Sequence, residues 1–413
     1  MADLTENRIE AFLREQELLA DGYDFREEVR RFSDEMERGL RGGPSSLKML
    51  PAYLDAAEAP DKSADVLAID AGGTNLRAAL VRFRAGQKPE ILTQDNTKIP
   101  GAAEPIPASG FFDEVAACAA PFAEGTDRVG FCFSYPSVTL PNLDARILYF
   151  AKEVEVEGAE GLLVGESLNA AFLRKGFVKK RMTVLNDTVA ALLGTLAAGE
   201  GLRQEYGGYL GLVFGTGMNY CYREPSSRML INTESGGYAG FRRGPCDLVL
   251  DGASADPGAQ RLEKMVSGAY FGELTLRVLK AAAEEGLFEA ETTARIRATG
   301  ELRAADIAAC VDRFAGDGAA DRQAVRRLID ALYDRAAKLL AICAAAMMTR
   351  GGDAAPETPR LLVCEGSSFR YGDRFRERFE RALSAGGAPP YELVTPDGVT
   401  LIGAAAAALR CKA

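Results

Sequence analysis

Residues 66–83 read VLAIDAGGTNLRAALVRF, an apolar run that turns at two glycines and returns as a second, alternating run. We expect a buried strand over 66–70, a tight turn over 71–75 and a returning strand over 76–83. A Walker phosphate loop is excluded, because that loop leads into a helix and needs Gly-Lys-Ser/Thr. The turn amides and Thr74 could still form a donor surface for phosphate. The alternative is a plain hairpin turn whose glycines supply positive φ.

The same arrangement returns in residues 209–222, which read YLGLVFGTGMNYCY. A strand, a Gly-Thr turn and a returning strand follow one another, roughly one domain later in the chain. One such hairpin is weak evidence for any function. Two hairpins of matching form predict two related halves that face each other over one polyphosphate.

Two further apolar strands are expected to end in polar side chains. Residues 183–188 read TVLNDT, and a helix is expected over 189–197. A carboxylate beside an amide at the end of a buried strand suits a general base for a hydroxyl, which favours Asp187. The alternative is an ordinary helix start capped by Asp187 or Thr188. In GFCFSYP, at 130–136, Ser134 is either a turn residue or a hydroxyl that binds a polar ligand.

Two glutamates stand close to glycines at the ends of expected elements. Glu234 lies in INTESGGY at 231–238, and Glu263 lies in RLEKMVSG at 261–268, which opens a helix expected to continue through Leu279. Glutamates are ordinarily solvated surface charges. At element ends, these two could instead accept hydrogen bonds from the hydroxyls of a polyol.

The rest of the chain is expected to be mixed α and β. Apolar residues at helical spacing predict that the first forty residues are helical, closed by Gly42-Gly43-Pro44. We expect residues 306–348 to be mostly helical and 361–364 to form a buried strand. An Ala-rich helix is predicted over 401–409.

Composition restricts the class of protein. The chain has 413 residues, enough for two or three domains, with 47% apolar and 26% charged residues, as in soluble globular proteins. A net charge of −10 argues against a nucleic-acid-binding surface. The eight cysteines form no Cys-x-x-Cys pair, so we expect small buried side chains of a reducing cytosol. The acidic N-terminus is unlike a signal peptide, and the apolar run 336–348 is too short to span a bilayer. A cytoplasmic protein is expected.

Histidine is absent from the sequence. Its absence excludes Ser-His-Asp and Cys-His catalysis and every His-ligated metal site. Acid–base work near neutral pH would then fall to carboxylates, or to a perturbed Lys, Cys or Tyr.

Together these segments resemble the hexokinase family over nearly the whole chain. Residues 70–77 and 215–219 resemble its two phosphate motifs, which actin-like ATPase folds share. The segments FSYP at 133–136, NDT at 186–188, NTE at 232–234 and EKMVSG at 263–268 are similar to its sugar-site segments. Gly366-Ser367 is similar to its adenosine-site turn, and residues 38–51 are similar to the segment before its first phosphate motif.

The resemblance implies an α/β fold of two actin-like (ribonuclease H-like) domains, with mixed sheets flanked by helices and a cleft between the domains. The small domain would comprise 64–200 plus 399–413, and the large domain 1–63 plus 201–398. The implied reaction is ATP-dependent phosphorylation of the 6-hydroxyl of a hexose, glucose first, with Mg²⁺ as cofactor. We expect a monomer or homodimer that binds neither nucleic acid nor membrane.

The resemblance also implies residue roles. Asp187 would be the catalytic base, and Asp70 would anchor Mg²⁺ through water. The sugar would be bound by Ser134, Lys152, Asn186, Asp187, Asn219, Glu234 and Glu263. ATP would be bound by Asp70, Gly72, Gly73, Thr74, Asn75, Arg77, Gly215, Thr216, Gly366 and Ser367.

The sequence departs from the family pattern in three places. Residues 151–154 read AKEV where the family has Thr-Lys-Gly-Phe, so Lys152 is kept and a Thr hydroxyl is lost at Ala151. Ser235 replaces an aromatic residue, and Glu365 replaces an aspartate. The change at Ala151 leaves open a kinase for another hexose or amino sugar, such as mannose or fructose. A non-catalytic sugar sensor with an actin fold is the other alternative, although the intact Asn186-Asp187 pair and both glutamates argue against it.

Overall fold

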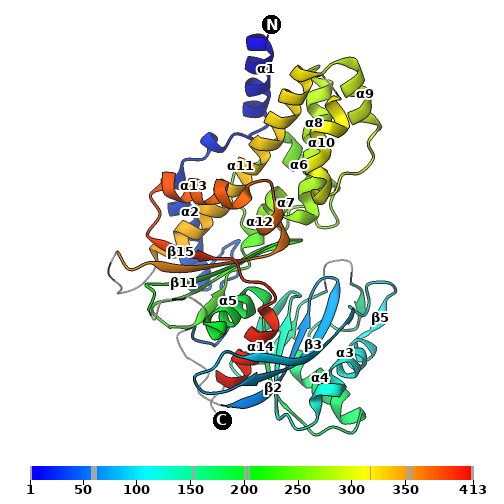
Figure 1. Ribbon diagram of the computed structural model, residues 1–413, viewed down its shortest axis with the longest axis vertical. Coiled ribbons are helices and arrows are strands. Elements are labelled where there is room, and N and C mark those ends of the chain that lie inside the picture. Colours follow the sequence, from blue (N-terminus) through cyan, green and yellow to red (C-terminus); the bar gives the residue numbers. More distant parts are fainter. Residues whose placement is uncertain are drawn as a thin grey trace.

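The computed structural model describes residues 2–56, 63–150, 154–199, 202, 205–316, 318–350, 355 and 357–410 (Figure 1). Two mixed sheets form its frame. The five-stranded sheet has the order β10 (Arg181–Leu185), β6 (Arg128–Phe133), β2 (Ala64–Ala71), β3 (Asn75–Phe83) and β4 (Glu90–Lys98). The six-stranded sheet has the order β1 (Leu50–Pro51), β13 (Leu230–Asn232), β12 (Met218–Arg223), β11 (Tyr209–Phe214), β14 (Arg360–Glu365) and β15 (Tyr391–Val394).

Both predicted hairpins form. β2 and β3 pair antiparallel, with Ala71 opposite Leu76 next to the turn. β11 and β12 pair antiparallel, with Phe214 opposite Met218. In each sheet the first hairpin strand also pairs in parallel with a later strand, β2 with β6 and β11 with β14. The carboxyl ends of these parallel strands therefore meet at one edge of each sheet, where ligands of α/β proteins bind.

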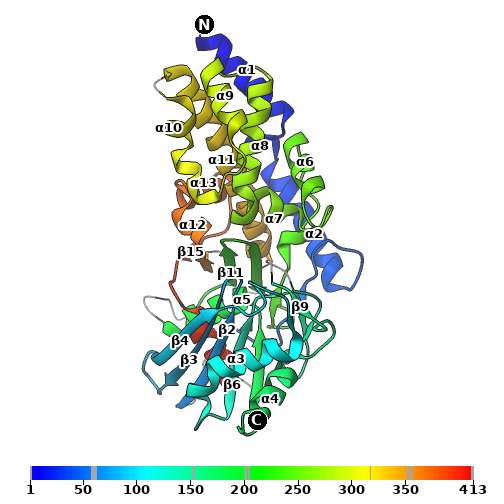
Figure 2. The same ribbon diagram turned by 90° about the vertical axis from the view of Figure 1, so that its right-hand side faces the viewer.

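Two helices lie between the sheets, α5 (Asp187–Ala198) and α14 (Thr400–Arg410) (Figures 1 and 2). Their buried residues form one hydrophobic cluster with strands of both sheets. Glycines permit the close contact, because a Cβ at Gly403 would lie 1.8 Å from the carbonyl oxygen of Ala190. A Cβ at Gly194 would lie 2.1 Å from the carbonyl oxygen of Val399. No side chain larger than hydrogen fits at these two contacts, so the interface between the helices depends on both glycines.

The other helices cover the outer faces of the sheets. Beside the five-stranded sheet lie α3 (Ala108–Ala123) and α4 (Val164–Arg174), which share a core with its strands (Figure 2). A larger core beside the six-stranded sheet draws on α1 (Ala2–Glu15), α2 (Phe25–Leu40), α6 (Pro245–Ala253), α7 (Arg261–Val266), α8 (Gly268–Glu284), α9 (Ala290–Ala298), α10 (Cys310–Ala315), α11 (Ala319–Thr349), α12 (Ser367–Tyr371) and α13 (Phe375–Gly386). Minor elements are β5 (Ile106–Pro107) with β9 (Val156–Glu157), β7 (Ser137–Thr139) with β8 (Ala145–Ile147), and short 3-10 helices at Ala20–Gly22, Ser235–Gly237 and Ala304–Ala309.

Three local predictions were wrong. The first was the cap of α5, because Asn186 is the N-cap residue and its side chain accepts from the amide of Thr188, whereas Asp187 already belongs to the helix. The second was the single helix from Arg261 to Leu279, because the chain breaks at Ser267, which is extended (φ −78°, ψ 155°) between α7 and α8. The third was helix over the first forty residues, because α1 ends at Glu15 and α2 begins only at Phe25, with a short 3-10 helix at Ala20–Gly22 between them. The remaining predicted strands and helices are present within a few residues.

Two compositional expectations can be compared with the structure. All seven cysteines in the described ranges are buried and free, as expected; Cys411 lies outside these ranges. Among the described residues, no helix is both long and apolar enough to cross a bilayer.

Candidate active site

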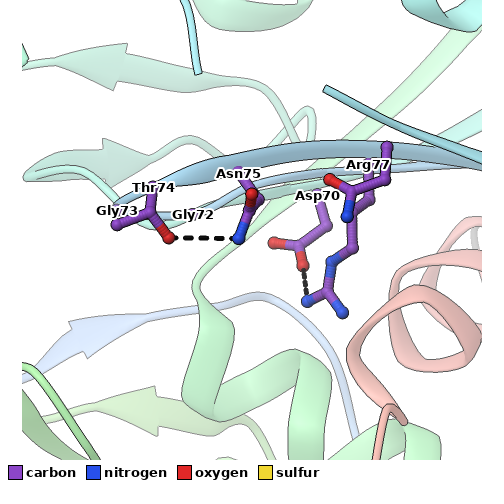
Figure 3. A pocket seen from close by; sticks show the side chains of 7 residues that line it. Asp70, Gly72, Gly73, Thr74, Asn75 and Arg77 are labelled. Atoms are coloured by element: carbon purple, nitrogen blue, oxygen red, sulfur yellow. Dashed lines mark hydrogen bonds and ion pairs between the residues drawn. The ribbon is translucent and has the colours of Figure 1, made fainter. Parts of the chain in front are cut away.

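The first Gly-Thr turn borders a pocket at the end of the β2–β3 hairpin (Figure 3). Asp70 and Arg77 stand opposite each other on the two strands and form an ion pair. Asp70 is only 3% exposed, so its charge depends on this partner. From α14, Thr400 joins them: its Oγ1 lies 3.3 Å from Asp70 Oδ2 and 3.2 Å from an Arg77 guanidinium nitrogen. The pocket is lined by Asp70, Gly72, Gly73, Thr74, Asn75, Arg77 and Asn96.

The first turn is also supported by Ser134 and Tyr135, which directly follow β6. The buried Tyr135 donates its hydroxyl to the carbonyl oxygen of Gly72 at 2.7 Å, and the amide of Ser134 donates to the carbonyl of Ala71 at 3.2 Å. Within the turn, the Gly72 amide donates to the Asn75 carbonyl at 3.1 Å. The end of β6 is thereby fixed against the first turn.

The second Gly-Thr turn is held from outside its own sheet. At the start of α8, the amides of Gly268 and Ala269 donate to the carbonyls of Gly215 and Thr216 at 2.8 and 2.9 Å. Ser368 Oγ also donates to the Gly215 carbonyl, at 3.0 Å. Gly366 packs so closely, at φ +115°, that a Cβ there would lie 2.3 Å from the carbonyl oxygen of Phe214. The predicted adenosine-site turn therefore lies directly against the predicted phosphate turn.

A chain of amide side chains runs from Asn186 to Glu234. Asn219 Nδ2 lies 3.5 Å from Asn186 Oδ1 and donates to Asn232 Oδ1 at 2.7 Å. Asn232 Nδ2 in turn donates to Glu234 Oε1 at 2.8 Å. Glu263 approaches from α7, where its Oε2 accepts the Met218 amide at 3.0 Å. Such a row of oriented amides and carboxylates offers donors and acceptors to a polyhydroxylated ligand.

The charges of Asp187 and Asp70 act on a third carboxylate, Glu365, where the two sheets meet. Burial, together with the charges of Asp187 and Asp70, raises the pKa of Glu365, at the end of β14, to about 7. Burial, Asp70 and Asp187 likewise hold the pKa of the Cys132 thiol well above its ordinary value. Asp187 thus follows Asn186 of the amide chain and also acts electrostatically on Glu365 and on Cys132, the residue of β6 that pairs with Asp70.

The structure brings together most residues predicted for the site. Asp70 to Arg77 share the pocket of Figure 3, and Gly215, Thr216, Gly366 and Ser367 form the second turn and its neighbour. Asn186, Asn219 and Glu234 are linked through the amide chain, with Glu263 at Met218. The predicted sugar ligand Lys152, and Ala151 beside it, lie outside the described residues.

Sequence reasoning missed four residues that complete this arrangement: Asn96, Tyr135, Asn232 and Thr400. Asn232 lies in the same NTE segment as Glu234, so its sequence position could have indicated a role at the site. Thr400 had no such signal, because it lies 330 positions from Asp70 in the chain.

The donor set suits Mg²⁺. Magnesium prefers oxygen ligands and keeps several waters, and Asp70, in the pocket at the first turn, supplies carboxylate oxygens. Asp70 is already paired with Arg77, which fits an anchor through water better than a direct ligand. Among the described residues, no three His, Cys, Asp or Glu side chains form a ready-made metal cluster.

Comparison with known proteins agrees with this geometry. Two family models, both described as hexokinase, match residues 10–197 and 209–410. Hexokinase-1 of Schizosaccharomyces pombe is 28% identical over 397 residues, which cover 86% of this chain and 80% of that protein. Human Hexokinase-1 is 29% identical over 399 residues, covering 86% of this chain but only 42% of the human protein. The chain therefore spans less than half the length of such longer relatives.

Solved structures share the fold. A hexokinase from Schistosoma mansoni, complexed with glucose, superposes with a TM-score of 0.79 at 23% identity and covers 98% of this chain and 100% of that one. This likeness supports the expected two-domain actin-like fold. With hexokinase models matching both halves and the fold of solved hexokinases, the chain belongs to the hexokinase family of hexose kinases.

Proposed function

We propose that this chain transfers the γ-phosphoryl group of ATP to the 6-hydroxyl of a hexose, with glucose as the first candidate. The observation that carries the proposal is the position of Asp187. It follows Asn186, which begins the amide chain to Glu234, and its charge acts on Glu365 and on Cys132, which pairs with Asp70 beside the first phosphate turn. A base at this junction can contact a sugar hydroxyl on one side and a terminal phosphate on the other.

Asp187 would accept the proton of the 6-hydroxyl as that oxygen attacks the γ-phosphate in line. Base catalysis of this kind contributes roughly 10²–10⁴-fold to the rate. Positioning and charge neutralisation would supply most of the remainder, because phosphoryl transfer needs little covalent assistance. The sugar ligands proposed are Ser134, Lys152, Asn186, Asn219, Glu234 and Glu263.

The two Gly-Thr turns would bind the phosphates, and Gly366 with Ser367 would bind the adenosine. Bound Mg²⁺ would neutralise charge on the β- and γ-phosphates. Arg77 already forms an ion pair with Asp70. It would therefore contribute to phosphate binding while it remains paired with that carboxylate. Asp70 would hold the ion's water shell.

We further propose the division into a small domain, 64–200 plus 399–413, and a large domain, 1–63 plus 201–398. Its support is that the five-stranded sheet draws its strands from 64–185, while the six-stranded sheet draws its strands from 50–51 and 209–394. Closure between the domains would exclude water, whose phosphorylation would waste ATP. The compartment proposed is the cytoplasm, and the assembly a monomer or homodimer.

The test is ADP release with MgATP and a panel of hexoses, for wild type and Asp187→Asn. We expect glucose-dependent turnover in wild type, and a kcat reduced about 10²–10⁴-fold in the variant. Asp113→Asn is the matched control, because Asp113 is an exposed carboxylate of α3 that pairs with Arg174 at 2.7 Å. Its kcat should equal that of wild type.

The same panel separates the alternatives. Turnover only with mannose, fructose or an amino sugar would keep the mechanism and change the substrate. Sugar binding without turnover of any hexose would contradict the kinase proposal and favour a sensor.

A further inference from the structure

A buried cluster of charges lies directly behind Glu263. Lys264 is only 2% exposed, yet its ammonium donates to Asp251 Oδ1 and to the Asp256 carbonyl, both at 2.7 Å. It also forms an ion pair with the Asp256 carboxylate at 2.9 Å. Asp251 is bound in addition by Arg243, at 2.8 Å, and by the Gly258 amide, at 3.0 Å. These bonds tie α7 to α6 and to the loop between them.

The short helix α7 needs such an anchor. It has six residues, follows Gln260 in the left-handed region at φ +45°, and breaks at Ser267. A helix of this length has almost no stability of its own, so contacts with other elements must decide where it lies. Lys264 supplies charge-assisted hydrogen bonds from a buried position, which are about twice as strong as neutral ones.

The position of α7 in turn determines how the second phosphate turn is held. Glu263 Oε2 accepts the Met218 amide at 3.0 Å, and a Cβ at Gly217 would lie 2.7 Å from the same oxygen. The next residues of the chain, Gly268 and Ala269, hold the carbonyls of Gly215 and Thr216. A shift of α7 would therefore disturb this turn through the Glu263 carboxylate and through the start of α8.

We propose that Lys264 is a positioning residue: with Asp251 it fixes α7 so that Glu263 binds the sugar and the second phosphate turn with one carboxylate. The affinities for sugar and ATP are thereby linked. The identity of these two substrates rests on the proposed function above, whereas the mechanical link between Lys264 and Met218 does not.

The test is Lys264→Met, which removes the charge and keeps the length of the side chain. Asp251 retains Arg243 and the Gly258 amide, so its carboxylate stays paired. We expect the KM for hexose and the KM for MgATP both to rise about tenfold, the effect of losing roughly one charge-assisted hydrogen bond. Amide hydrogen exchange of residues 215–219 should accelerate by a similar factor.

Arg223→Met is the matched control. Arg223 binds Asp55 at 2.7 Å, and Asp55 would retain Arg228 at 3.1 Å, as Asp251 retains Arg243. Arg223 ends the same strand that Met218 begins, about 16 Å away along β12. Both KM values and the exchange of residues 215–219 should stay within twofold of wild type in this variant.

Unchanged exchange at 215–219 in Lys264→Met, or an equal acceleration in Arg223→Met, would overturn the proposal. A rise in the hexose KM alone would overturn the link between the two affinities. If wild type released no ADP with any hexose, the proposed function would fail, but the exchange measurement would still decide the role of Lys264. If Lys264→Met does not fold, the milder Asp251→Asn should accelerate exchange at the same residues, and its failure to do so would contradict the anchor.

Discussion

The two Gly-Thr turns look alike in sequence but are stabilised in different ways. The first is held mainly by its own sheet, through the Asp70–Arg77 pair across the hairpin and through Tyr135, which follows the neighbouring strand β6. The second is held by α8, Glu263 and Ser368, which come from other parts of the chain. Their glycines differ too: a Cβ at Gly72 would meet only the Asn75 carbonyl at 3.7 Å, whereas one at Gly217 would meet Glu263 Oε2 at 2.7 Å.

This difference has a functional meaning under the proposed reaction. A turn supported by its own sheet presents a fixed phosphate surface whether or not a sugar is bound. A turn supported by Glu263 can respond to the sugar, because the same side chain is a proposed sugar ligand. The two turns should therefore respond separately to substitution.

The largest effect is expected from Arg77→Met at the first turn. Asp70, 3% exposed, would lose its cationic partner, which costs about 3 kcal/mol, the low end for buried pairs because the Arg77 side chain is 37% exposed. Hydrogen exchange of the β2 and β3 amides measures this loss. The control is Arg82→Met at the other end of the hairpin, where Arg82 and Asp65 are each 33% exposed, and the cost should stay below about 1 kcal/mol. Equal costs for the two variants would show that burial of Asp70 does not matter.

The next effect is expected at the second turn, from Gly217→Ala. The added methyl group would displace the Glu263 carboxylate from the Met218 amide, a charge-assisted bond worth about 1.5–3 kcal/mol. We expect kcat/KM for the hexose to fall about 10–100-fold.

Gly72→Ala is the matched control at the first turn. A Cβ there would lie 3.7 Å from the Asn75 carbonyl oxygen, which is an ordinary contact distance. Steady-state kinetics should show its KM for hexose unchanged. A loss of hexose affinity in both variants would remove the distinction between the two turns.

A third prediction concerns pH and Glu365, which precedes the turn of Gly366. Its folded pKa is raised to about 7 by burial and by Asp187 and Asp70, from an ordinary 4.5, so the folded chain binds an extra proton between these values. The contribution of this group to the free energy of unfolding is fully present below pH 4.5 and is lost as the pH rises through 7. The loss is at most about 1.4 kcal/mol per pH unit. Glu365→Gln should therefore raise the Tm relative to wild type more at pH 8 than at pH 5. Parallel Tm curves for the two proteins across this range would contradict the assignment.

The smallest effect is expected from Tyr135→Phe. The variant leaves the Gly72 carbonyl without its 2.7 Å donor, which should cost about 1 kcal/mol locally. Hydrogen exchange in residues 71–75 should accelerate, and the segment 215–219 should not respond. Tyr23→Phe is the control, because it removes another buried hydroxyl, which donates to the Arg242 carbonyl at 2.9 Å, and it should leave exchange in 71–75 unchanged. Acceleration in 215–219 would mean that the two turns are mechanically joined.

Much of the fold was predictable because its signals are local. Period-two apolar runs ending in glycines predicted β2–β3 and β11–β12, and the apolar run before Glu365 predicted β14. The break at Ser267 was not predictable, because residues 261–279 carry a continuous helical pattern. Its cause is tertiary: after the break, Gly268 and Ala269 turn their amides towards the carbonyls of the second turn.

By itself the sequence determined the elements, both Gly-Thr turns, the family resemblance and the residues expected at the site. Only the tertiary structure decided how these residues support one another. In the folded chain Thr400 contacts Asp70, Asn232 links Asn219 to Glu234 by hydrogen bonds, and Glu263 accepts the amide of Met218. The physical reason is that periodicity and turn chemistry act over a few neighbouring residues. The contact of α14 with the first turn and the contact of α7 with the second arise instead from the packing of segments far apart in the chain.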